Sequence, residues 1–285
     1  MVNLSGLRQL RQHIDVDREM QLRRSVFRVL PVAHRSPHDA VFHVTVFKTA
    51  SQWMRVVLSD PRVYRRSGLL PYVFGGHGKV AADPTAHAVA PRSLVLSLYA
   101  NRQTFDLIPK PDRWRVLLVA RDPMDLLVSW HFSNRYTHPE NPAILRRREI
   151  MAGMSEEQAL DYTIGEFGQV NDLLLPWLAE DDPQVFLYRY EDLTGQNAAS
   201  TWEDLMADAG IDLSGSRLGK VLATYRQENL RSTRATPDRR SDKYASGRSG
   251  SWEQVLTPSQ VQEFRQRYAP LIDAYARRFG AQARP

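Results

Sequence analysis

The stretch VFHVTVFKTASQWMRVVLSDP, from Val41 to Pro61, changes character halfway along. Its first six residues are mostly apolar or β-branched and suit a buried strand. Lys48 and four small or polar residues follow, and Trp53 then opens an apolar run at helical spacing. Ligands of an open parallel sheet gather where its strands end. A lysine at this strand-to-helix turn therefore predicts an anion-binding site.

The rest of the chain repeats the alternation of strand and helix. Buried strands are expected over 41–46, 94–98, 116–120 and 185–190, and helices over 51–60, 123–134, 155–180, 198–209, 216–224 and 258–279. Short apolar runs separated by helices are typical of a parallel sheet that is covered on both faces. We therefore expect an α/β fold, a three-layer α/β/α sandwich around a central parallel sheet.

Length and composition are those of an ordinary globular domain. The 285 residues, 42% of them hydrophobic, predict one domain over 1–285, with residues 1–36 as an N-terminal helical extension packed on it. The amphipathic stretch 3–30 is expected to pack on the domain, with peripheral contact to a membrane or a partner helix as the alternative. The sequence shows no membrane span, no secretory signal and no cysteine, which favours a cytoplasmic location.

The charge predicts an anionic partner. The net charge is +6, and of the 38 basic residues only five are lysines, so a lysine can mark a site that needs a compact charge. Nucleic acid, an anionic membrane surface and a phosphorylated cofactor all fit this charge alone. The segment GGHGKV (75–80) resembles the end of a Walker A loop, but Val80 replaces the required Ser or Thr, and Val73, followed by Phe74, stands where the leading glycine belongs.

Two further segments could bind phosphate. In RVLLVARDPMDLLVSWHFSN (115–134), a strand ends at Ala120, and Arg121 precedes a helix that carries Ser129. A guanidinium and a hydroxyl on such a helix can share one phosphate group. SDKYASGRSGSWEQVLT (241–257) is a Gly- and Ser-rich basic segment that could close over a phosphate, with a solvated charge run as the alternative.

Together these stretches resemble the sulfotransferases that depend on 3′-phosphoadenosine-5′-phosphosulfate (PAPS), particularly their soluble bacterial members. FKTASQW (47–53) is similar to the family's 5′-phosphosulfate loop, and RDPMDLLVSWHF (121–132) to its 3′-phosphate motif. RYEDL (189–193) and YASGRSGSW (244–252) are similar to two later motifs, in the family's order. The resemblance implies the P-loop NTPase-like sulfotransferase fold. It also implies PAPS as co-substrate, 3′-phosphoadenosine-5′-phosphate (PAP) as product, a small-molecule, lipid or sugar acceptor, and no metal.

The resemblance also implies which residues bind the nucleotide. The 5′-phosphosulfate would be surrounded by Lys48, Thr49, Ala50, Ser51 and Gln52. The adenine would be contacted by Trp53, Tyr190 and Thr224, and the 3′-phosphate by Arg121, Ser129, Gly247 and Arg248. Lys48 would also be catalytic, by stabilising the negative charge that develops on the bridging oxygen.

This chain departs from the family pattern at three places. Ala50 replaces a glycine, so the loop must avoid a positive φ there or differ in shape. Ala245 and Ser246 replace an Arg-Lys pair, and we expect Arg248 to supply the missing cation. VLSLYANRQTF (95–105) lacks the family's basic histidine. The candidates for the general base are therefore His77, His87, His131 and a carboxylate such as Asp106. His131 matches a structural position of the family and is discounted, and we interpret His43 as a core residue.

Two other classes of protein were weighed against this resemblance. A nucleotide-binding, kinase-like P-loop protein would share the fold, but it should carry a Walker A loop with a magnesium-binding hydroxyl. A nucleic-acid-binding module needs basic and aromatic residues interleaved on one surface. Lys48 and Arg121 stand instead at predicted strand ends, so no nucleic acid partner is expected.

Overall fold

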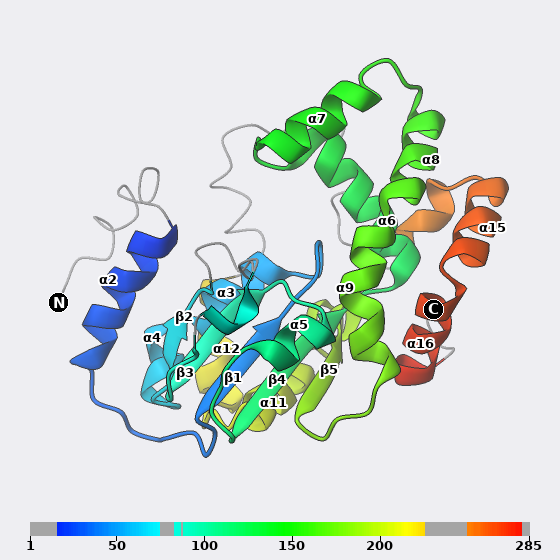
Figure 1. Ribbon diagram of the computed structural model, residues 1–285. Helices are drawn as coiled ribbons and strands as arrows, with labels where there is room; N and C mark the ends of the chain where they lie inside the picture. The colour runs from blue at the N-terminus through cyan, green and yellow to red at the C-terminus, as the bar shows by residue number, and fades with distance from the viewer. Residues whose placement is uncertain (1–15, 75–82, 87, 226–249, 281–285) are drawn as a thin grey trace.

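A parallel sheet of five strands forms the centre of the fold (Figure 1). The computed structural model describes residues 16–74, 83–86, 88–225 and 250–280. The strand order is β2-β3-β1-β4-β5, and the strands are β1 (Ala40–Val44), β2 (Leu70–Tyr72), β3 (Ser93–Leu98), β4 (Trp114–Ala120) and β5 (Val185–Arg189). Four of these strands were predicted. The edge strand β2 was not, because it has three residues and one of them is Pro71.

Helices cover both faces of the sheet, which confirms the three-layer sandwich. The residues of β1 alternate, with Phe42 packed into one core and Val41 into the other. The Val41 side is covered by α3 (Ser51–Leu58), α4 (Pro61–Arg65), α11 (Ala198–Asp208) and α12 (Gly215–Thr224). The Phe42 side is covered by α5 (Arg102–Leu107), α6 (Pro123–Phe132), α8 (Glu156–Glu166), α9 (Gly168–Ala179), α15 (Pro258–Arg267) and α16 (Ala269–Phe279).

Several predicted helices are divided into two. The helix expected over 155–180 breaks at Phe167 between α8 and α9, and the one expected over 258–279 breaks at Tyr268 between α15 and α16. The helix expected over 51–60 ends at Leu58. Pro61 then opens α4, with the Asp60 carboxylate accepting the Arg62 N–H at 2.7 Å. An Asp followed by Pro is a helix start as well as a helix stop, which explains the difference.

The N-terminal helix α2 (Val16–Arg28) packs beside β2, at the left in Figure 1. Phe27 stacks on Tyr64 at 5.1 Å, and the Arg24 guanidinium lies 5.4 Å from the ring of Tyr72. These contacts support the interpretation of a helix packed on the domain for this part of the extension. None of the helices in the described ranges is long and apolar enough to cross a bilayer.

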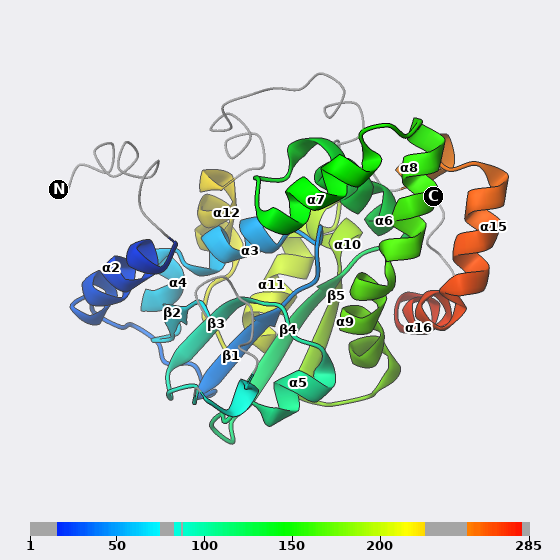
Figure 2. The same cartoon turned by 45° about the horizontal axis from the view of Figure 1, so that its top comes forward.

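The order of the strands decides where a ligand can bind. The chain leaves β1 through α3 toward the edge strand β2, whereas it leaves β4 toward the opposite edge at β5. β1 and β4 are neighbours, with Val44 opposite Leu118. Such a reversal opens a crevice at the carboxyl ends of two parallel strands. Figure 2 shows α3, α6 and the short α10 (Tyr190–Thr194) at this end of the sheet.

Candidate active site

The turn after β1 holds its backbone in an unusual conformation. Lys48 has a φ of 66° and Ala50 a φ of 62°, and α3 begins directly afterwards at Ser51. Left-handed residues in a turn bring neighbouring N–H groups to one side, which makes a concave nest for an anion. Of the two alternatives given for this loop, the one in which Ala50 avoids a positive φ is wrong. This alanine takes the left-handed conformation, at a cost of about 1–2 kcal/mol relative to ordinary backbone.

Buried threonine hydroxyl groups stabilise this turn through hydrogen bonds. The Thr49 side chain is fully buried, and its hydroxyl donates to the Val46 carbonyl at 3.1 Å and lies 3.1 Å from the hydroxyl of Thr45. The backbone N–H of Thr49 is therefore the group that this residue can offer to a ligand.

The end of β3 contacts the same turn. Between Phe42 and Val44 the neighbouring strand β3 runs from Val95 to Leu98, so β3 contains one extra residue. This bulge includes Ser97, whose φ is 53°. The Ser97 hydroxyl donates to the Ser51 carbonyl at 3.2 Å. β3 thus helps to fix the start of α3.

Tyr99, just beyond β3, is a site residue that the sequence did not point to. Its hydroxyl donates to the Ser51 Oγ at 3.1 Å, and its ring stacks on Phe47 at 5.4 Å. Burial raises the pKa of Tyr99, so the phenol stays protonated and acts as a donor at neutral pH. The contact fixes the orientation of the Ser51 hydroxyl at the start of α3.

Arg121 follows β4 at the neighbouring strand end. Its side chain is 4% exposed, and its guanidinium lies 4.6 Å from the centre of the Tyr190 ring. The buried Nε has no hydrogen-bond partner among the described residues. Asp122 caps α6 by accepting the N–H groups of Met124 and Asp125, both at 3.0 Å. Ser129 lies along α6 and is half-buried. An unpartnered buried guanidinium nitrogen is a group that an anion would satisfy.

Two carboxyl groups lie buried near Arg121. Burial raises the pKa of Asp122 to about 6, and it also raises the pKa of Glu191. The Asp122 N–H donates to Glu191 Oε1 at 3.3 Å, and the Tyr275 hydroxyl donates to Glu191 Oε2 at 3.3 Å. These bonds connect the end of β4 with α10 and α16, and so hold Arg121 in a fixed frame.

Asp125 is a second residue that the sequence reasoning missed. It is 1% exposed, and it accepts hydrogen bonds from the Gly250 N–H at 2.7 Å, the Ser251 hydroxyl at 2.9 Å and the Trp252 N–H at 3.2 Å. The end of the Gly- and Ser-rich segment is thereby attached to the first turn of α6. The sequence feature that could have pointed to Asp125 is the presence of an acidic residue in a mostly apolar helix. Gly247 and Arg248 lie outside the described residues.

The residues expected to contact adenine lie on the α3 side. Trp53 packs edge-on against Trp202 at 5.1 Å and is half-buried. The Thr224 hydroxyl donates to the Lys220 carbonyl at 2.8 Å and accepts from Arg62 Nη2 at 3.1 Å. Trp53, Tyr190 and the end of α12 all pack on the same hydrophobic core, and Tyr190 also lies beside Arg121. Gln52, in the first turn of α3, is exposed.

Most alternatives for the general base are engaged in other contacts. His131 is buried between the Thr163 hydroxyl and Glu156, each at 2.8 Å, as expected for a structural residue. Asp106 is ion-paired with Arg102 at 3.0 Å. His43 accepts the Ser97 N–H at 3.2 Å, and burial lowers its pKa to about 3, so it is a neutral core residue. Its Nε2 is unpaired within the described residues. His77 and His87 lie outside those residues.

Comparison with known proteins gives one family. Residues 94–276, more than half of the chain, match the family model described as a sulfotransferase domain. The structure of mouse sulfotransferase SULT7A1 complexed with PAP is similar, with a TM-score of 0.54 at 15% identity, over 88% of this chain and 87% of that one. Retinol dehydratase in complex with androsterone and inactive cofactor PAP gives a TM-score of 0.47 at 14% identity, over 83% and 80% of the two chains. No curated protein sequence matches. The likeness to the mouse structure confirms the fold.

Proposed function

Because this chain belongs to the sulfotransferase domain family, we propose that it transfers a sulfuryl group from PAPS to a hydroxyl or amine of a small organic acceptor. The observation that carries the proposal is the pair of anion-binding features at the ends of the adjacent strands β1 and β4. The left-handed turn at Lys48 suits the 5′-phosphosulfate, and the unpartnered Arg121 Nε suits the 3′-phosphate. We propose that residues 1–285 form one such domain.

The residues of the Lys48 turn have different roles in binding PAPS. Lys48 provides a mobile charge beside the bridging oxygen, and the N–H groups of Thr49 to Gln52 add donors at the start of α3. The Ser51 hydroxyl accepts from Tyr99, so its own proton is directed away from the tyrosine and toward the crevice. PAPS supplies the sulfuryl group and leaves as PAP. The PAP complexes of two similar structures support this choice of donor.

The acceptor is proposed from an aromatic wall beside Lys48. Phe47 stacks on Tyr99 at 5.4 Å and on Trp130 at 6.4 Å. Such a wall favours an acceptor with a flat or apolar body over a free sugar. We propose His77 or His87 as the general base, since His43 and His131 are buried in structural contacts.

Calorimetry with PAP tests the proposal. We expect PAP to bind the wild-type protein tightly and adenosine 5′-phosphate to bind weakly. Arg121→Ala should weaken PAP binding by about 100-fold, because it removes a buried charged partner of the 3′-phosphate, and should leave adenosine 5′-phosphate unchanged. Arg146→Ala, an exposed arginine on α7 (Pro142–Met151), is the matched control.

The fold of each variant is checked by its thermal midpoint. Arg121→Lys keeps the positive charge but loses the planar guanidinium with its paired donors. Its affinity for PAP should therefore lie between those of the wild-type protein and Arg121→Ala. Equal affinity for PAP and adenosine 5′-phosphate in the wild-type protein would overturn the proposed donor and leave the kinase-like alternative.

A further inference from the structure

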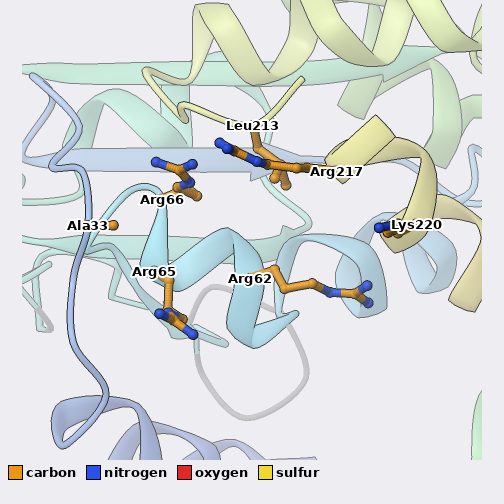
Figure 3. Close-up of a pocket in the computed structure, with 7 residues that line it drawn as sticks. All are labelled: Ala33, Arg62, Arg65, Arg66, Leu213, Arg217 and Lys220. Atoms are coloured by element: carbon orange, nitrogen blue, oxygen red, sulfur yellow. The ribbon is translucent and has the colours of Figure 1, made fainter. Parts of the chain in front are cut away.

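A basic cleft lies beside α4 (Figure 3). Its volume is about 420 Å³. The cleft is lined by Ala33, Arg62, Arg65, Arg66, Leu213, Arg217 and Lys220. These residues come from the segment after α2, from α4 and the residue that ends it, and from α12 with the residues before it. Elements distant in sequence thus bring five cationic side chains to one hollow.

The charge of the cleft is only partly neutralised. Arg62 pairs with Asp60 at 2.8 Å, and Arg66 pairs with Asp212 at 2.9 Å. Within the described residues, no ion pair is formed by Arg65, Arg217 or Lys220, and all three are exposed. Three uncompensated cations beside two fixed ones repel each other unless an anion lies between them.

The two paired arginines also have defined positions. Arg62 donates from Nε and from Nη2 to the two oxygens of Asp60, each at 2.8 Å. These two bonds fix the orientation of the Arg62 guanidinium. Leu213, which is 3% exposed, and Ala33 provide an apolar lining. Fixed donors, exposed cations and an apolar lining together form a site for a small anion rather than an evenly solvated surface.

The cleft is separate from the nucleotide site. α3 runs from the Lys48 turn to Leu58, a length of about 12 Å, and α4 with its arginines lies beyond its far end. Among the described residues, the two sites are linked through Thr224, whose hydroxyl accepts from Arg62 Nη2 at 3.1 Å and donates to the Lys220 carbonyl at 2.8 Å. An anion in the cleft would therefore leave the Lys48 turn accessible.

We propose that this cleft is a second anion-binding site, which takes a small molecule with two closely spaced phosphate or sulfate groups. Arginine forks match the oxygen geometry of such groups, and two groups engage more of the cations than one can. The volume lies in the range of small-molecule sites, which favours a small polyanion over a segment of nucleic acid. This inference does not depend on the proposed transfer reaction.

The test is a calorimetric titration with inorganic pyrophosphate. The double variant Arg65→Gln/Arg217→Gln removes two uncompensated cations from the cleft. The control Arg146→Gln/Arg277→Gln removes the same charge from exposed positions on α7 and α16. We expect the dissociation constant to rise about tenfold or more in the cleft variant, because two charge-assisted bonds are lost, and to stay unchanged in the control.

A third variant, Lys48→Met, separates the cleft from the nucleotide site. Pyrophosphate binding to the cleft should persist in this variant. The proposal is overturned if wild-type protein binds no pyrophosphate at millimolar concentration, or if both double variants weaken binding equally. Loss of binding in Lys48→Met with full binding in the cleft variant would also overturn it, since the anion would then occupy the nucleotide loop.

Discussion

Replacing Ala50 by glycine isolates the energetic effect of the left-handed turn after β1. At a φ of 62°, an L-residue is disfavoured by about 1–2 kcal/mol relative to the right-handed region. Glycine relieves this strain, but it gains about 0.5–1 kcal/mol of conformational freedom in the unfolded chain. The half-buried methyl group that is lost is worth about 0.4 kcal/mol, half of a fully buried one. The three effects largely offset one another, so we expect Ala50→Gly to be close to neutral or to stabilise the fold by up to about 1 kcal/mol.

The matched control is an alanine with ordinary backbone. Ala152 follows α7, is exposed, and has a φ of −62° and a ψ of −37°. Ala152→Gly therefore has no strain to relieve and should destabilise the fold by about 0.5–1 kcal/mol.

Urea unfolding followed by circular dichroism measures both changes. The midpoint for Ala50→Gly should be equal to or above that of the wild-type protein, and the midpoint for Ala152→Gly should be below it at an unchanged slope. If Ala50→Gly destabilises the protein as much as Ala152→Gly, Ala50 is not in the left-handed conformation and the reasoning about the anion nest fails.

Two further predictions concern the buried carboxyl groups of α6. Asp125→Asn should destabilise the fold by about 1–3 kcal/mol and weaken PAP binding, because its one amide oxygen can replace only one of the two carboxylate oxygens that accept from Gly250, Ser251 and Trp252. The exposed Asp112→Asn should do neither; urea midpoints and calorimetry measure both effects. Because the pKa of Asp122 is raised to about 6, its ionisation lowers stability as the pH rises from about 4 to 6. Asp122→Asn should therefore be about 3 kcal/mol more stable than wild type at pH 7.5 and about 1 kcal/mol more stable at pH 4.5. His43, whose pKa is lowered, favours stability at higher pH, so the difference between variant and wild type is the quantity to compare; a difference independent of pH contradicts the assignment.

The main elements of the fold were predictable because each buried strand is a continuous apolar run. β1, β3, β4 and β5 are each mostly apolar, and α3, α6 and α9 are amphipathic or apolar over two or more turns. Helix breaks within apolar stretches were not predictable. Phe167 and Tyr268 suit a helix interior by propensity, and it is their packing against each other, at 5.2 Å between ring centres, that coincides with the breaks.

In the candidate site too, residues with a local sequence pattern were predictable, and residues whose role depends on tertiary contacts were not. Lys48 and Arg121 were found because they directly follow predicted strands, and parallel strands place such residues at one edge. Tyr99 and Asp125 were missed because their roles depend on contacts with residues 48 and 125 positions away in the sequence. The positive φ of Ala50 could not be read from the sequence, because it depends on tertiary contacts: the Thr49 hydroxyl and a bond from β3 to the Ser51 carbonyl fix the residues on either side of it.

The attachment of residues 250–252 to Asp125 has a consequence for how this protein can diverge. One carboxylate on α6 accepts three bonds from a stretch that lies more than a hundred positions later in the chain. A mutation at either end leaves buried donors or a buried charge unpaired, so it would be eliminated unless the other end changed with it. Asp125 and the Gly250–Trp252 stretch should therefore be inherited as a linked set, and a swap of one without the other between related enzymes should give a poorly folded chimera.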